Sequence, residues 1–258
     1  MKSIKNIAFA GSGNVAFHLA KNLKLKGYNI SGVWSRDFMH AQAFANLIDS
    51  QAFDTVSGLR ANADLIIIAV TDSAIEDVAR AIGDFNGIVV HTAGSVEMDV
   101  FQGIFKEYGI LYPLQTFSKD IPVPINDIPF FTEASSLETL LKIKEIASNL
   151  STKVYEADSR QRMLLHVAAV FAGNYSNLMY IIGNELSKAS ELPPEVLHPL
   201  ITETARKAVT GDPHKTQTGP ARRNDTITIE KHVKALASLP EYAELYSLLA
   251  NMIITKVK

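Results

Sequence analysis

The chain has 258 residues, a net charge of −2, 47% hydrophobic and 20% charged residues, and no cysteine. This composition predicts a folded protein with room for two domains. It excludes a disordered chain, a broad basic surface for nucleic acid, disulfides and thiol catalysis. Because the start resembles no signal peptide and no apolar run could span a bilayer, we expect a cytoplasmic protein without nucleic-acid or membrane partners.

The first predicted elements are a strand over 4–10 and a helix over 15–25, joined by a glycine turn. Gly11, Gly13 and Ala16 form the pattern G-x-G-x-x-A. Gly11 permits the tight turn, Gly13 has no Cβ to block a pyrophosphate, and Ala16 lets the helix pack closely on the strand. Since a helix N-terminus offers free N–H groups, the stretch predicts dinucleotide binding; a tight turn without a ligand is the alternative. The residues expected at the pyrophosphate are Gly11, Ser12, Gly13, Asn14 and Val15.

A second strand is predicted over 29–34, and Ser35, Arg36 and Asp37 follow where it should end. An acidic residue at this point binds the adenosine ribose in NAD enzymes, whereas an arginine and a hydroxyl suit the 2′-phosphate of NADP. Ser35 and Arg36 therefore favour NADP(H). Asp37 leaves NAD open if the strand runs longer.

Three further apolar strands are predicted over 64–70, 87–91 and 110–114, as expected for strands buried on both faces of a parallel sheet. Each runs into a polar cluster, and ligands bind beyond the carboxyl ends of such strands. We therefore expect one crevice beside the glycine turn, although turns and helix caps would also explain the polar residues. The expected cofactor contacts are Val70, Thr71, Asp72, Thr92, Ala93 and Gly94, and the expected substrate contacts are Gln115 and Thr116.

The pattern changes near Asp158, after which almost every stretch is helical. We predict an α/β Rossmann domain with a doubly wound parallel sheet over 1–157 and an all-α domain over 158–258. The helix predicted over 161–186 is apolar on most sides, which favours a homodimer formed through the helical domain. A polar loop is predicted over 211–226. The other predicted elements are helices over 38–48, 136–150 and 193–210, and strands over 52–56, 129–132 and 152–155.

Several motifs carry a resemblance to a known group of proteins. They are GSGNVA at 11–16, HTAGSV at 91–96, PLQTFS at 113–118, HVAAVFAGNYSNLMY at 166–180 and GPARRND at 219–225. On these, nearly the whole chain resembles bacterial Rossmann-like proteins classed as NADP oxidoreductases, with an uncharacterised C-terminal helical domain. This group is similar to 6-phosphogluconate and β-hydroxyacid dehydrogenases, pyrroline-5-carboxylate reductase and deazaflavin-dependent NADP reductases. The resemblance implies NADP(H) as cofactor and a 6-phosphogluconate-dehydrogenase-like helical domain. Tyr112 departs from the pattern, because histidine is expected before this proline.

The catalytic residue of the dehydrogenases does not transfer to this chain. They use a lysine on the first long helix of the second domain, and residues 161–182 contain no lysine. We take His91, His166 and Asn174 as the catalytic candidates. His166 has a side chain suited to acid–base work near neutral pH, and Asn174 could bond to a substrate. The alternatives are a packed helix histidine at His166 and a strand-end histidine at His91 that bonds only to backbone.

Arg223 and Asp225 are the remaining candidates for substrate binding. They suit a carboxylate or phosphate of the substrate, or an ion pair that orders their own loop. The histidines show no metal-ligand spacing, so we expect no metal site.

These features together predict an NADP(H)-dependent oxidoreductase that transfers a hydride to or from a small polar metabolite bound between the two domains. The main alternative is a non-catalytic NADP(H)-binding sensor or scaffold. A third interpretation is a binder of nucleotide sugars or phosphate esters that takes no nicotinamide. The sequence names no substrate.

Overall fold

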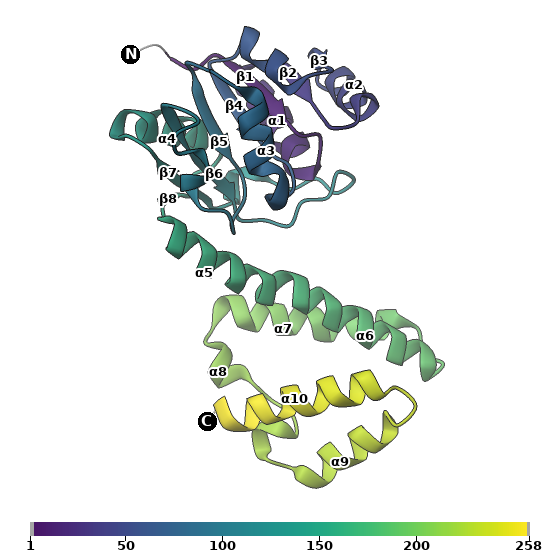
Figure 1. Ribbon diagram of the computed structural model, residues 1–258. Coiled ribbons are helices and arrows are strands. Elements are labelled where there is room, and N and C mark those ends of the chain that lie inside the picture. Colours follow the sequence, from purple (N-terminus) through teal and green to yellow (C-terminus); the bar gives the residue numbers. More distant parts are fainter. Residues whose placement is uncertain (1–2, 257–258) are drawn as a thin grey trace. The chain divides into compact units, whose positions relative to one another are not determined.

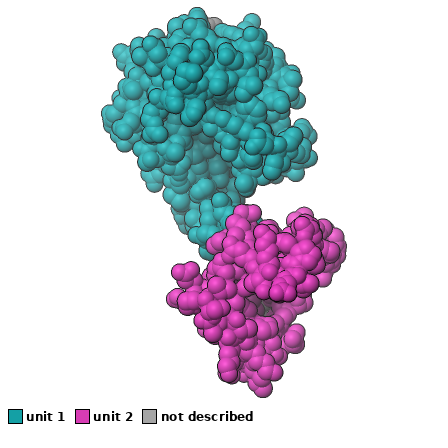
Figure 2. All heavy atoms as spheres, turned by 90° about the vertical axis from the view of Figure 1, so that its right-hand side faces the viewer, with its two compact units in different colours: residues 1–176 teal, residues 177–258 magenta. Residues whose placement is uncertain are grey.

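The computed structural model describes residues 3–256 (Figure 1). Contacts within the chain divide it into two compact units, Met1–Ser176 and Asn177–Lys258, which Figure 2 shows in different colours. The first unit contains the sheet, and the second is helical.

The first unit is built on one 8-stranded sheet with the order β3-β2-β1-β4-β5-β6-β7-β8. Neighbouring strands are parallel except β6 and β7, which run antiparallel. The predicted fold class is thus confirmed, with one antiparallel pair next to the edge strand. The connection over 114–129 between the two strands of that pair contains a short 3₁₀ helix and not the α-helix that usually joins parallel strands. The strands are β1 (Asn6–Ala10), β2 (Asn29–Trp34), β3 (Ala52–Phe53), β4 (Leu65–Ile68), β5 (Ile88–His91), β6 (Glu107–Pro113), β7 (Phe130–Ala134) and β8 (Val154–Glu156).

Two hydrophobic layers cover the faces of the sheet. Successive side chains of a strand point to opposite faces. Ile7 and Phe9 of β1 accordingly pack in a cluster with the first, second and fourth helices, whereas Ala8 and Ala10 pack with the third. The strands β4 and β5 are buried along their whole length, which explains their continuous apolar sequence. These helices are α1 (Asn14–Leu25), α2 (Phe38–Leu47), α3 (Ile75–Ile82) and α4 (Leu137–Leu150).

A helical run follows the sheet. It begins with α5 (Ser159–Ala169), where Asp158 and Gln161 form a capping box. It continues as a π-helical segment, Val170–Tyr175, and then as α6 (Ser176–Ala189), so the single α-helix predicted over 161–186 is interrupted by wider turns. The contact division falls at the end of the π segment, because α5 bonds to the sheet unit. The domain boundary between residues 157 and 158 stays a prediction.

The second unit consists of α6, α7 (His198–Thr210), α8 (Pro213–Thr216), α9 (Thr226–Ala235) and α10 (Pro240–Lys256). None of the helices in the part of the chain that the structure describes is long and apolar enough to cross a membrane. The remaining 3₁₀ helices of the chain span Val56–Ala61, Asp72–Ala74, Met98–Phe101, Ile125–Asp127, Pro194–Leu197 and Ala221–Arg223.

Two sequence predictions need correction. The polar loop expected over 211–226 contains α8 and a 3₁₀ turn, since Asp212 accepts a hydrogen bond from the backbone N–H of His214 and caps α8. The strand expected over 52–56 is reduced to β3, because the chain turns into the 3₁₀ helix at Val56, a buried residue.

Candidate nucleotide-binding and active site

The carboxyl ends of the parallel strands border a cavity of about 720 Å³. This is the edge of an open α/β sheet where ligands bind. Most of the cofactor residues expected from the sequence line it, and so does Gln115. Asp72, Ala93 and Thr116 lie next to lining residues in the chain, and Gly94 lies two positions after Thr92. The lining residues are Gly11, Ser12, Gly13, Asn14, Val15, Trp34, Ser35, Arg36, Ala69, Val70, Thr71, Ala74, Asp77, Val78, Thr92, Gln115 and Phe117.

The glycine turn has two glycines with different structural demands. Gly11 has φ +126°, donates its N–H to the carbonyl oxygen of Trp34 at 2.7 Å, and would bring a Cβ within 2.1 Å of the Ala69 oxygen. Gly13 has an ordinary φ of −76°, and a Cβ there would meet nothing within 4 Å. Gly11 is therefore required by the backbone conformation of the turn. The space at Gly13 lies open beside the cavity.

This open space fits a pyrophosphate. Gly13 is the N-cap residue of α1 and has no side chain to cap the helix. The first N–H groups of a helix have no partner within it and attract anions. A bare backbone of this kind beside a cavity is the arrangement that a dinucleotide phosphate requires.

The end of β2 presents a hydroxyl and a cation to the cavity. Ser12 donates its side-chain hydroxyl to that of Ser35 at 3.1 Å, and Arg36 lines the same cavity. The Asp37 carboxylate instead accepts a hydrogen bond from the Met39 N–H at 2.9 Å and caps α2. Ser35 and Arg36 line the cavity whereas Asp37 does not, so the local chemistry favours a 2′-phosphate.

Side chains of α1 hold the segment after β6 in place. Asn14 donates a side-chain N–H to the Phe117 oxygen at 2.9 Å, and His18 donates Nε2–H to the Ser118 oxygen at 2.8 Å. The Phe117 and His18 rings lie 5.0 Å apart. The side chain of Asn14 is therefore used within the protein.

His91 lies inside the protein. It is 0% exposed, its Nδ1 accepts a hydrogen bond from the Ala93 N–H at 3.2 Å, and its ring packs edge-on against Phe101. Burial, with a smaller contribution from Arg162, lowers the pKa of His91 to about 3. The residue is a neutral support for the loop after β5. As a catalytic group it stays a prediction that its burial does not support.

His166 meets a partner that the sequence did not single out as functional. Its Nδ1 lies 3.2 Å from the hydroxyl of Tyr112 at the end of β6. A Cβ on Gly94 would come within 2.7 Å of this Nδ1 and 2.8 Å of Tyr112 Cζ, so the glycine lets the two rings meet. Burial raises the pKa of Tyr112. The pair lies beside the loop that contains Thr92, which lines the cavity.

Arg162 fixes the start of α5 to the sheet. It is 0% exposed, forms an ion pair with Glu133 of β7, and donates to the Val96 oxygen and the Ser159 hydroxyl. His166 follows one helical turn later on α5. Tyr112 and Arg162 were the residues that sequence reasoning missed, and the only signal was the departure of Tyr112 from the family motif.

The other expected site residues have varied surroundings. The Ser95 hydroxyl donates to the Asp72 carboxylate, which ties two strand-end loops together. Thr116 donates its N–H to Gln115 Oε1 at 2.8 Å. Asn174 is exposed within the π-helical segment, a kind of distortion frequent at functional sites.

Arg223 and Asp225 belong to the second unit. Asp225 caps α9 by accepting hydrogen bonds from the Thr228 N–H and hydroxyl, and these bonds lower its pKa. Its role in the structure is thus a helix cap. Substrate binding by either residue stays a prediction.

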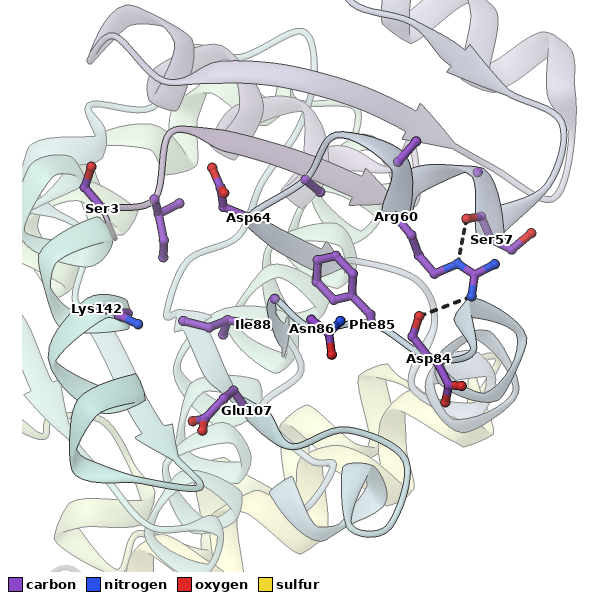
Figure 3. A pocket seen from close by; sticks show the side chains of 15 residues that line it. Ser3, Ser57, Arg60, Asp64, Asp84, Phe85, Asn86, Ile88, Glu107 and Lys142 are labelled. Atoms are coloured by element: carbon purple, nitrogen blue, oxygen red, sulfur yellow. Dashed lines mark hydrogen bonds between the residues drawn. The ribbon is translucent and has the colours of Figure 1, made fainter. Parts of the chain in front are cut away.

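A second large cavity, of about 640 Å³, lies at the opposite end of the strands (Figure 3). Its charged groups bond to the protein itself: Arg60 donates to the Ser57 and Asp84 oxygens, and Asp64 accepts from the Asn6 N–H. We assign it no function. Among residues 3–256 no cluster of three or more potential metal ligands occurs.

Comparison with known proteins identifies the family. Residues 6–93 match the family described as NADP oxidoreductase, coenzyme F420-dependent, and residues 128–253 match a domain family described as being of unknown function (DUF2520). A crystal structure from Bacteroides fragilis, of a candidate NADP oxidoreductase, is 42% identical with a TM-score of 0.92 and covers 98% of each chain. The chain belongs to this family of NADP oxidoreductases. The resemblance inferred from its motifs is confirmed.

More distant structures share the fold. A 1-pyrroline-5-carboxylate reductase from Streptococcus pyogenes is 14% identical with a TM-score of 0.66, and covers 99% of this chain and 98% of its own. An imine reductase from Myxococcus stipitatus in complex with NADP+ is 15% identical with a TM-score of 0.64, and covers 98% of this chain and 92% of its own. No protein in a search of curated sequences matches the chain.

The two glycines of the turn should respond differently to alanine. We expect Gly11→Ala to lower the free energy of unfolding by at least about 2 kcal/mol, because it adds a clash to a backbone conformation that only glycine adopts readily. Gly13→Ala should cost less, about 1 kcal/mol, because the added Cβ meets no neighbour and the loss is only that of replacing a glycine N-cap by the poorer alanine. Urea unfolding followed by the emission of Trp34 measures both, and equal losses would contradict this division of roles.

His91 should make the stability of the first unit depend on pH. Its pKa in the folded protein is about 3, below the unfolded value of 6.5, so unfolding takes up a proton between these values. Stability is therefore full above pH 6.5 and falls by up to about 1.4 kcal/mol per pH unit below it. In His91→Gln this part of the slope should vanish in Trp34-monitored unfolding from pH 7 to 4.5. The exposed-site control His40→Gln should keep the wild-type slope, and a slope unchanged in His91→Gln would refute the buried neutral state.

Proposed function

We propose that the protein is an NADP(H)-dependent oxidoreductase that acts on a small polar metabolite. The observation that carries the proposal is the cavity at the strand ends, where Gly13 leaves open space and Arg36 and Ser35 line the wall. The family description and the NADP+ complex of the imine reductase with the same fold support it. Binding of the substrate between the two domains stays a prediction.

The residues of this chain would bind and orient the cofactor. The N–H groups at the start of α1 would hold the pyrophosphate, and Ser35 with Arg36 the 2′-phosphate. When bound, NADP(H) supplies or accepts the hydride. Thr92 and Gln115, which line the cavity from the ends of β5 and β6, are our proposed contacts nearer the reacting ring.

Trp34 allows a direct test of nucleotide binding, since this single tryptophan lines the cavity. We expect NADPH to quench its emission and to bind at least about tenfold more tightly than NADH, the equivalent of about 1.4 kcal/mol from the contacts with the 2′-phosphate. Gly13→Ala should bind both nucleotides more weakly although it folds normally. If neither nucleotide bound, the proposed function would be overturned, and equal affinities would overturn the choice of NADP.

We propose that Tyr112 and His166 form the proton-transfer pair of the reaction. Reduction of a C=O or C=N bond needs a proton on the heteroatom as the hydride reaches carbon, and a hydrogen-bonded phenol and imidazole suit this task. Their atoms lie 3.2 Å apart, and the α5 lysine of the dehydrogenases is missing. Asn174, which is exposed on the same helical run as the half-buried His166, is our proposed substrate contact.

A double-mutant cycle tests the pair on a carbonyl or imine substrate found by screening with NADPH. Tyr112→Phe and His166→Gln should each lower kcat by about 100-fold or more, the double variant should lose little beyond either, and the Kd of NADPH should change less than about twofold. The control is Tyr155→Phe, an exposed tyrosine of β8. Additive losses would argue against a shared proton.

The rival function is a sensor or scaffold that binds NADP(H) without chemistry. It is favoured by the missing lysine and by the burial of His91. A sensor would show the NADPH preference but no oxidation of NADPH with any carbonyl, imine or deazaflavin.

We also propose a homodimer. Along α5 and the π segment, the apolar side chains of Leu164, Val167, Phe171 and Tyr175 are all exposed at spacings that place them on one side of a helix. A second copy of the chain is the proposed cover for this row, because large exposed apolar patches mark interaction surfaces.

Light scattering after gel filtration tests the dimer. We expect a mass of twice 28.2 kDa, and a shift toward 28.2 kDa for Phe171→Glu. Leu25→Glu, at an equally exposed apolar residue of α1, is the matched control and should leave the mass unchanged. A monomeric wild-type protein would contradict the proposal.

A further inference from the structure

A smaller cavity adjoins the proposed nucleotide site. It has a volume of about 310 Å³ and shares Ser12 and Gly13 of the glycine turn with the larger cavity. Besides the apolar residues Ala43, Phe44 and Leu47 of α2, its wall includes two basic residues absent from the larger one, His40 on α2 and Lys119. The glycine turn thus has a cation on each side: Arg36 in the large cavity and Lys119 in the small one.

The position of Lys119 is set by α1. Ser118 and Ile121 pair across a tight turn, so Lys119 lies at its tip, and the Ile121 N–H donates to the Ser118 oxygen at 3.3 Å. That same oxygen accepts the hydrogen bond from His18, and the preceding residue is held by Asn14. The segment is therefore clamped at its base, and this reduces the entropy cost of using its lysine to bind a ligand.

Lys119 is the lysine of the small cavity, and it is unengaged. Within residues 3–256, Lys119 has no hydrogen bond or ion pair with another side chain. The acidic residue nearest to Lys119 in the chain is Asp120, on the same turn. The acidic residue nearest to His40 is Asp37, whose carboxylate lies 3.8 Å from His40 Nδ1 and caps α2. A lysine beside open backbone N–H groups is a site for a phosphate oxygen.

We propose that Lys119, with His40 at its side, binds the 2′-phosphate of the nucleotide from the face opposite Arg36, and so determines the preference for NADP over NAD. The inference rests on the proposed function, because it needs a nucleotide on the glycine turn. A 2′-phosphate carries up to two negative charges. Arg36 alone would leave such a dianion incompletely neutralised. The residue that completes the site lies on a segment more than eighty positions further along the chain.

The test compares two nucleotides that differ only in this phosphate. Trp34 quenching should give a Kd for NADPH about tenfold weaker in Lys119→Met than in the wild type, with the Kd for NADH changed less than about twofold. Competition by 2′,5′-ADP should weaken in the same proportion, and competition by 5′-AMP should not. Lys119→Arg should retain most of the preference, because it keeps the charge.

The matched control is Lys26→Met, which removes an exposed lysine at the other end of α1 and should leave both Kd values unchanged. His18→Phe tests the clamp: it keeps an aromatic ring beside Phe117 but removes the bond to Ser118, and it should weaken NADPH alone by about threefold.

Two results would overturn the inference while leaving the proposed function intact. An unchanged NADPH-to-NADH ratio in Lys119→Met would show that Arg36 and Ser35 suffice. Equal weakening of both nucleotides would mean that Lys119 neutralises the pyrophosphate instead. If the wild-type protein bound neither nucleotide, the proposed function and the inference would both fail.

Discussion

The close approach of three strand ends at Gly11 is the constraint on which the nucleotide site depends. The Gly11 N–H bonds to the end of β2, and its α-carbon faces the backbone just after β4 with no room for a side chain. This contact stops β1 and starts α1 within a few residues, so the helix N-terminus, Ser35 and Arg36 reach one cavity. The binding chemistry thus follows from a steric requirement of the backbone. The polar side chains act within a frame that the glycine sets.

The buried Arg162 has the corresponding role for the proposed pair of Tyr112 and His166. Burying a guanidinium is costly unless it is paired, and here Nη1 and Nη2 of Arg162 donate hydrogen bonds to a carboxylate, a carbonyl and a hydroxyl, whereas its Nε is buried without a partner among the described residues. These partners come from three parts of the chain, so α5 has one defined position against the sheet unit. This position places His166 beside Tyr112. The ion pair between Arg162 and Glu133 therefore helps to fix where the His166 ring lies.

Much of the sheet and of the nucleotide site could be predicted from the sequence, because these parts depend on local patterns. The apolar runs of β4 and β5, the glycine spacing and the Ser35-Arg36 pair need only neighbouring residues to be interpreted. The bond from Asn14 to Phe117 and the meeting of Tyr112 with His166 join residues far apart in the chain, so no local pattern encodes them. His91 shows what a local pattern does not predict. The sequence placed it at a strand end, but its ring packs against Phe101, which is ten residues further along the chain. The antiparallel direction of β7 was likewise not predicted, since we expected a parallel sheet from the sequence.

Gly94 separates the nucleotide cavity from the proposed proton-transfer pair. Any side chain there would press between Tyr112 and His166, yet the residue lies outside the lining of the nucleotide cavity. A substitution at this one position would therefore remove the proposed proton transfer and leave the lining of the nucleotide cavity as it is. The same fold would then remain a receptor for its redox carrier without acting as a catalyst.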